Sequence, residues 1–106
     1  MQYYRKIMNL LETYFKEKNW QKYFLKGGCY WLADFLNHGI KDSVIMINRM
    51  EEHCAIYFCG GLYDVTGRIS AKNYVVAGKK EISFMKKNYV PKFDTHEVLR
   101  YLENNL

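Results

Sequence analysis

Two glycine pairs divide this chain and limit the folds that it can adopt. Gly27-Gly28 interrupts a helical pattern, and a short apolar helix is predicted to restart at Cys29 and to run to about residue 38. Gly60-Gly61 separates two apolar runs that are rich in β-branched residues, which is typical of a tight β-hairpin, because glycine accepts the positive φ of such turns. The stretch 27–69 is therefore predicted to be a central helix followed by antiparallel strands.

The segments on either side are predicted to cover this core. Apolar residues at helical spacing predict an amphipathic helix over 2–18, and Asn19 is a candidate cap for a short second helix. Gly39 is expected to end the helix of Cys29 in the left-handed conformation. A capping box at Asp94 predicts a last helix. Strands are predicted over 43–49, 53–59, 62–66, 73–77 and 81–85, with a turn at Gly78-Lys79-Lys80. This order favours an α+β fold with an antiparallel sheet.

The length of the chain, 106 residues, indicates a single domain. We divide it into an N-terminal helical arm (1–26), a core (27–69) and a basic C-terminal part with strands and the last helix (70–106). The three cysteines are an odd number without regular spacing, which argues against a disulfide framework and favours a reducing, cytoplasmic compartment. No signal peptide and no apolar run of ~20 residues is seen, so no membrane association is expected.

The net charge of +5 is unevenly distributed along the chain. Residues 1–26 carry six Lys or Arg and two Glu, and residues 70–93 carry six Lys and one Glu, so these segments hold +4 and +5. Residues 27–69 and 94–106 each hold −2. Basic segments of this kind attract nucleic acid or an acidic protein, or they are simply solvated. Lys79, Lys80, Lys86 and Lys87 are the candidate docking surface.

Cys29 is the candidate nucleophile because it starts the predicted central helix. Unpaired backbone N–H groups and the positive end of the helix dipole stabilise a thiolate there and lower its pKa. The same N–H groups can hold a developing oxyanion, and Gly28 lets a substrate approach the backbone closely. Tyr30 and Trp31 are expected to lie near the substrate. The alternative is a buried, unreactive cysteine at the start of a core helix.

His53 and Asp64 are the candidate base and the candidate orienter of that base. His53 opens a strand directly after a polar turn, where it is accessible and titrates near neutrality, although a hydrogen-bonded surface histidine would show the same pattern. Asp64 stands in an apolar strand, where a carboxylate needs a partner such as an imidazole N–H. Together with Cys29 they supply a nucleophile, its base and the group that orients the base.

The register of the hairpin decides whether His53 and Asp64 meet. If Gly60-Gly61 forms the turn, Asp64 lies on the same face as His53 but about 13 Å away along the strand. If Cys59-Gly60 forms the turn, Asp64 lies opposite Ala55 and diagonal to His53, within reach of contact. A three-residue loop would place Asp64 on the other face. The sequence leaves these three registers open.

This pattern resembles the transglutaminase-like branch of the papain-like cysteine enzymes. The matching positions lie within about residues 27–67 and are Gly27, Cys29, Ala33, Gly39-Ile40, His53 and Asp64. The resemblance implies a minimal papain-like core, with N-terminal helices and a central Cys-bearing helix packed on an antiparallel sheet. It also implies thiol-dependent acyl transfer on a protein or peptide, as in a peptidase, deamidase or transglutaminase. Gln21 is the nearest upstream candidate for the oxyanion-binding glutamine.

A non-catalytic binding protein on the same scaffold is the second hypothesis. The small size and the basic segments suit a phage-type inhibitor that docks on a host protein or a ribonucleoprotein complex. Lysines interleaved with aromatic residues in the C-terminal third would suit contacts to nucleic acid, but the solvent face of a sheet gives the same pattern. No Cys-x2-Cys pair and no phosphate-binding motif is present, so neither a metal nor a cofactor is predicted.

Overall fold

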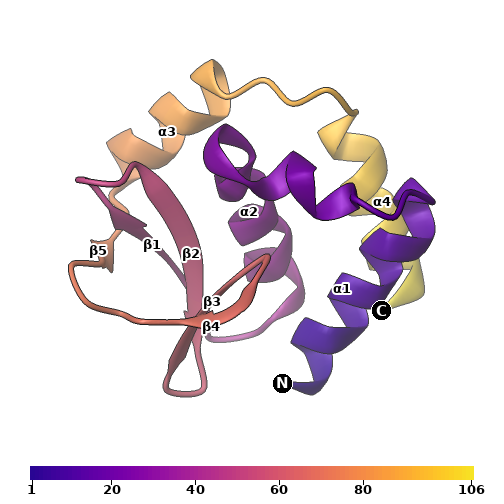
Figure 1. Ribbon diagram of the computed structural model, residues 1–106, viewed down its shortest axis with the longest axis horizontal. Helices are drawn as coiled ribbons and strands as arrows, with labels where there is room; N and C mark the ends of the chain where they lie inside the picture. Colours follow the sequence, from indigo (N-terminus) through magenta and orange to yellow (C-terminus); the bar gives the residue numbers. More distant parts are fainter.

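Helix α2 (Cys29–Gly39) lies at the centre of the fold because it is apolar on almost every side. The computed structural model describes residues 1–106, apart from the side chain of Lys26. One face of α2 packs on the β-sheet, and its other face contacts α1 (Gln2–Phe15) and α4 (Thr95–Asn105) (Figure 1). The predicted α+β fold with an antiparallel sheet is confirmed.

The N-terminal helix is shorter than predicted and has a different place. It ends at Phe15 because Lys16 adopts the left-handed conformation, with φ 55°. Two short 3-10 helices follow, η1 (Trp20–Phe24) and η2 (Lys26–Gly28). The expectation that these helices cover the sheet is largely wrong, since α1 packs mainly against α2 and α4. Only its first turn reaches the sheet, where the Tyr4 hydroxyl donates to the carbonyl oxygen of Asp64.

The sheet has five antiparallel strands in the order β4-β3-β2-β1-β5. The predictions of the three central strands are confirmed, and their observed ends lie within two residues of the predicted ends. β4 was not predicted, and β5 is much shorter than the predicted strand over 73–77. The strands are β1 (Val44–Asn48), β2 (His53–Phe58), β3 (Gly61–Asp64), β4 (Gly67–Ile69) and β5 (Val75–Val76).

The hairpin between β2 and β3 turns at Cys59-Gly60. Phe58 pairs with Gly61, and the two residues between them have positive φ, 48° and 76°. Of the turns that the sequence left open, Cys59-Gly60 is therefore the one found, and Gly60-Gly61 is not. Gly61 belongs to the strand, where an added Cβ would lie 2.9 Å from the Tyr63 ring. The small size of Gly61 therefore makes room for the Tyr63 ring on the same strand and is not needed for the turn.

The C-terminal part holds two helices where one was predicted. The strand over 81–85 and the turn at Gly78-Lys79-Lys80 are wrong, because these residues form the N-cap and the body of α3 (Lys79–Asn88). Ile82 and Met85 lie at helical spacing, but the alternation around Phe84 also resembles a strand. The Gly78 N–H donates to the Glu81 carboxylate at 3.1 Å and closes the first turn of α3.

Two predicted helix ends have different outcomes. The cap of α4 is confirmed, since the Asp94 carboxylate accepts from the N–H groups of His96 and Glu97 at 3.0 and 3.2 Å. The prediction that Gly39 ends the helix in the left-handed conformation is wrong. Helix α2 ends instead at Ile40, whose backbone is extended, with φ −116°. Gly39 is needed for the contact with α1, since an added Cβ would lie 2.6 Å from Cδ1 of Ile7. Among the residues that the structure describes, no helix has the length and apolarity to cross a membrane.

Candidate active site

The side chains of Cys29, His53 and Asp64 meet at one end of the sheet. Each comes from a different element: Cys29 begins α2, His53 begins β2 and Asp64 ends β3. His53 Nε2 lies 2.8 Å from Asp64 Oδ2. His53 and the Cys29 thiol are also close enough for each group to shift the pKa of the other. Because Asp64 occupies Nε2, Nδ1 is the other ring nitrogen that a proton transfer could use. The structure thus brings together the three residues singled out from the sequence, while their catalytic roles stay predictions.

The register of the hairpin produces this contact. Ile56 pairs with Tyr63, so the ladder continues to Ala55 opposite Asp64. His53 is two residues before Ala55 and is therefore the diagonal neighbour of Asp64 on the same face. Of the three registers left open by the sequence, the one with the turn at Cys59-Gly60 is found.

Asp64 is held on both sides of its carboxylate. Its Oδ1 accepts hydrogen bonds from the backbone N–H of Thr66, at 2.8 Å, and from the Thr66 hydroxyl. Its carbonyl oxygen accepts from the Tyr4 hydroxyl of α1. Burial alone would raise the pKa of Asp64, but the hydrogen bonds from His53 and Thr66 outweigh it and lower that pKa. Asp64 is therefore an ionised and oriented partner for the imidazole.

The electrostatics of the site favour a charged pair of thiolate and imidazolium. Hydrogen bonds from the Cys54 thiol first, and then from His53, lower the pKa of Cys29 to about 5 against the opposing effect of burial. Hydrogen bonds to Asp64 first, and then to Cys29, raise the pKa of His53 to about 10. Between these two values the thiolate and the imidazolium are both charged, which is the reactive state of a cysteine nucleophile.

Cys54 also lies in the site, although the sequence did not single it out. Its backbone N–H donates to Cys29 Sγ at 3.2 Å, and its own Sγ lies 3.2 Å from Sδ of Met85 on α3. The hydrogen bond with Cys29 raises the pKa of Cys54, so Cys54 stays a neutral thiol beside the thiolate. The only signal for this role in the sequence is that Cys54, directly after His53, is expected to be buried. Its contact with Met85 could not be expected, because Met85 belonged to a predicted strand.

Cys29 is covered, with 3% of its surface exposed. Three hollows lie beside its neighbours in the site. One lies over Gly27-Gly28 at the start of α2 and one lies between β1 and α3, and Tyr89 lines both. The third contains His53, Asp64 and Tyr74, with a volume of about 560 Å³. The Tyr74 ring meets the His53 ring edge to face, with centroids 6.3 Å apart. Tyr74 and Tyr89 are further site residues without a signal in the sequence.

The other residues expected near the substrate have diverse environments. Gly28 precedes α2, but its small size serves packing, since an added Cβ would lie 1.7 Å from the carbonyl oxygen of Tyr23. Tyr30 is fully buried and hydrogen-bonds to Asp34. Trp31 is half-buried, and its Nε1 donates to the carbonyl oxygen of Tyr89. Gln21 is exposed on η1, and its role as an oxyanion donor stays a prediction.

The four lysines of the candidate docking surface lie at the two ends of α3 and are exposed. Since they belong to a helix, Lys79 and Lys86 are seven residues apart on one face, and so are Lys80 and Lys87. Arg49 of β1 ties this helix to the sheet through two hydrogen bonds to Glu81, at 2.8 and 2.9 Å. The lysines therefore form a basic strip that is fixed relative to the sheet.

No group of three or more His, Cys, Asp and Glu side chains could hold a metal ion among the residues that the structure describes. Cys59 lies on the exposed hairpin turn at the other end of β2 from His53.

Comparison with known proteins assigns almost the whole chain to a family. The family model described as "Phage YunG-like protein" matches residues 7–103. No curated protein matches the chain, and no solved structure does. The expected membership in the transglutaminase-like branch of the papain-like enzymes is wrong, because a different family accounts for the residues that carried the resemblance. That resemblance depended on a few positions, and constellations of this kind recur on unrelated folds.

Proposed function

The chain belongs to the Phage YunG-like family, and we propose that it is a thiol-dependent enzyme that transfers acyl groups through Cys29. One observation carries the proposal. The His53 imidazole contacts the Asp64 carboxylate at 2.8 Å through Nε2, and His53 and Cys29 each shift the pKa of the other toward the charged pair. A nucleophile, a base and an orienting carboxylate in this sequence of contacts are the parts of a catalytic triad.

The proposed reaction begins with the thiolate of Cys29. Its sulfur attacks the carbonyl carbon of an amide or ester, and the π electron pair of the carbonyl moves to the oxygen. The backbone N–H of Cys29, at the positive end of α2, stabilises that oxyanion. The carbonyl then re-forms from the oxyanion, and the bond from the carbon to the leaving nitrogen or oxygen breaks. The leaving atom keeps that electron pair and takes the Nδ1 proton of the His53 imidazolium, so a thioester on Cys29 remains.

The second half of the reaction regenerates the thiolate. Neutral His53 takes a proton from water or from an acceptor amine, which attacks the thioester carbon. The carbon–sulfur bond breaks, and its electron pair returns to Cys29. Asp64 stabilises the imidazolium in both halves. Water as acceptor gives a peptidase or deamidase, whereas an amine gives a transglutaminase-like product.

Thiol alkylation at pH 6 tests this proposal without a known substrate. Iodoacetamide is expected to modify Cys29 much faster than Cys54 or Cys59, as measured by peptide mass spectrometry. His53→Ala is expected to slow the reaction of Cys29 at least about tenfold, because the thiolate loses its counter-cation. Cys59→Ser serves as the control and leaves the rate at Cys29 unchanged. Labelling of Cys29 at or below the rate of Cys59 would refute the proposal that the chain is a thiol-dependent enzyme.

A non-catalytic binding protein is the second candidate, and the family description, with its reference to phage, favours it. The basic strip on α3 is the candidate contact surface for a host protein or a ribonucleoprotein. On this proposal Cys29→Ala keeps the binding of a target, while Lys79→Glu with Lys80→Glu, or Lys86→Glu with Lys87→Glu, abolishes it. Pull-down of one defined target by the three variants tests this candidate, and binding that survives both charge reversals would contradict it.

A further inference from the structure

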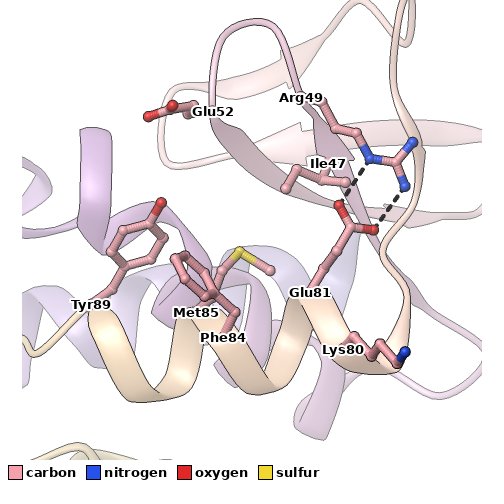
Figure 2. A pocket seen from close by; sticks show the side chains of 8 residues that line it. All are labelled: Ile47, Arg49, Glu52, Lys80, Glu81, Phe84, Met85 and Tyr89. Atoms are coloured by element: carbon pink, nitrogen blue, oxygen red, sulfur yellow. Dashed lines mark hydrogen bonds and ion pairs between the residues drawn. The ribbon is translucent and has the colours of Figure 1, made fainter.

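The hollow between β1 and α3 has a mainly apolar lining and lies next to the buried site. Figure 2 shows Ile47 of β1 on one side and Phe84 and Met85 of α3 on the other, with Tyr89 at one end. Its volume is about 350 Å³. Such a volume is at the lower limit of small-molecule sites, so it suits one large side chain and not a folded segment.

Met85 forms the floor of this hollow and is connected to Cys29 through Cys54. Met85 is 3% exposed, and its Sδ lies 3.2 Å from Sγ of Cys54. The N–H of Cys54 in turn donates to Sγ of Cys29 at 3.2 Å. Tyr89 is a common wall between this hollow and the one over Gly27-Gly28, where α2 begins. A side chain seated on Met85 would therefore lie beside Tyr89, the wall that this hollow shares with the one at the start of α2.

The charges around the hollow select a neutral side chain. Arg49 and Glu81 neutralise each other through their pair of hydrogen bonds, at 2.8 and 2.9 Å. Lys80 and Glu52 lie toward opposite ends of the rim, as Figure 2 shows, and carry opposite charges. The rim thus has no net charge, and the floor offers no polar partner to an ionised group. A buried charge without a partner is strongly disfavoured.

We propose that the hollow between β1 and α3 binds a large apolar side chain, such as leucine or phenylalanine, of a peptide substrate of Cys29. This rests on the proposed function and adds the class of substrate to it. Burial of one such side chain on Met85 and Phe84 favours that substrate about 10- to 100-fold over one with glycine at the same position.

The test uses the purified full chain and two panels of tripeptide vinyl sulfones. In one panel the residue beside the electrophile is Gly, Leu, Phe, Lys or Glu, and in the other the residue before it is varied in the same way. The rate of Cys29 modification at pH 6 is measured by intact mass spectrometry. We expect Leu and Phe to react at least tenfold faster than Gly, Lys and Glu in one of the panels. Equal rates within both panels would overturn the inference.

Two variants of α3 locate the preference. Phe84 is 60% exposed, so Phe84→Ala removes one wall with little risk to the fold, and it is expected to reduce the preference for Leu and Phe several-fold. Ser83→Ala, an exposed neighbour outside the hollow, is expected to keep it. A preference that Phe84→Ala leaves intact would place the side chain elsewhere and overturn the inference. Failure of iodoacetamide to select Cys29 would instead refute the proposed function, so the two failures are distinguishable.

Discussion

Nε2 of His53 lies 2.8 Å from Oδ2 of Asp64, although the two residues are diagonal neighbours and not partners in the β2–β3 ladder. The hydrogen bond to this carboxylate is the largest cause of the raised pKa of His53, which is about 10. Asp64→Asn keeps the shape of the side chain but removes its charge, so the imidazolium loses stabilisation and the pKa of His53 is expected to fall well below 10. Titration of the His53 ring protons by NMR measures this change.

The control for this titration is Asp94→Asn, which changes a carboxylate at the cap of α4. Asparagine is also a good N-cap, so the fold is kept, and the pKa of His53 is expected to stay near its wild-type value. A pKa that stays near 10 in Asp64→Asn would show that Asp64 does not set the charge of the imidazole.

Cys54 is expected to control the acidity of Cys29, because its thiol is the largest cause of the lowered pKa. In wild type the alkylation rate of Cys29 is expected to fall as the pH drops through about 5, since the thiolate is lost there. Cys54→Ala removes the thiol donor, so the midpoint of this pH profile is expected to move upward. Cys59→Ala is the matched control and should leave the midpoint in place. An unchanged midpoint in Cys54→Ala would contradict the prediction.

Gly28 and Gly27 are expected to respond very differently to alanine. A Cβ on Gly28 would lie 1.7 Å from the carbonyl oxygen of Tyr23, whereas one on Gly27 would meet nothing closer than 3.8 Å. Gly28→Ala must displace backbone and is expected to lower the free energy of unfolding by about 3 kcal/mol or more. Gly27→Ala should change it by less than about 0.5 kcal/mol. Urea unfolding of the two variants checks the difference, and equal midpoints would contradict the packing of η1 on η2.

Substitutions at the two residues of the left-handed turn, Cys59 and Gly60, are expected to have opposite effects on stability. Gly60 has φ 76° and open space around it, so Gly60→Ala is expected to cost about 1 kcal/mol from backbone strain alone. Cys59 has φ 48°, which asparagine tolerates better, so Cys59→Asn is expected to stabilise the protein by creating an Asn-Gly turn. Cys59→Ser isolates the loss of the thiol. Thermal unfolding measures whether each variant is more or less stable than wild type. Stabilisation by Gly60→Ala would contradict the turn at Cys59-Gly60.

The sequence predicted the central part of the fold well because its signals there were local. The break before Cys29, the β-branched runs and the cap at Asp94 each act within a few residues of the element that they define. The position of the turn stayed open because two adjacent glycines satisfy the same rule, and the packing of Tyr63 against Gly61 distinguishes them. That single residue of register decides whether His53 reaches Asp64.

The C-terminal half of the site could not be predicted from local patterns. The segment 79–88 alternates and also repeats at helical spacing, so its helical state depends on tertiary contacts such as Arg49 with Glu81. With a strand in its place, Met85 and Tyr89 had no reason to approach Cys29. The same limit applies to Cys54, whose role depends on the distance between two elements and not on any spacing along the chain.

Cys59 gives this protein a natural tether. It is exposed, while Cys29 and Cys54 are buried, and it lies six residues from His53 along the β2 hairpin, or about 20 Å. A dye or a solid support attached there at mildly alkaline pH, with Cys29 transiently protected, would leave the opposite end of the sheet facing solution. The chain can therefore be immobilised in one orientation, with its candidate site presented to peptides, without a residue being changed.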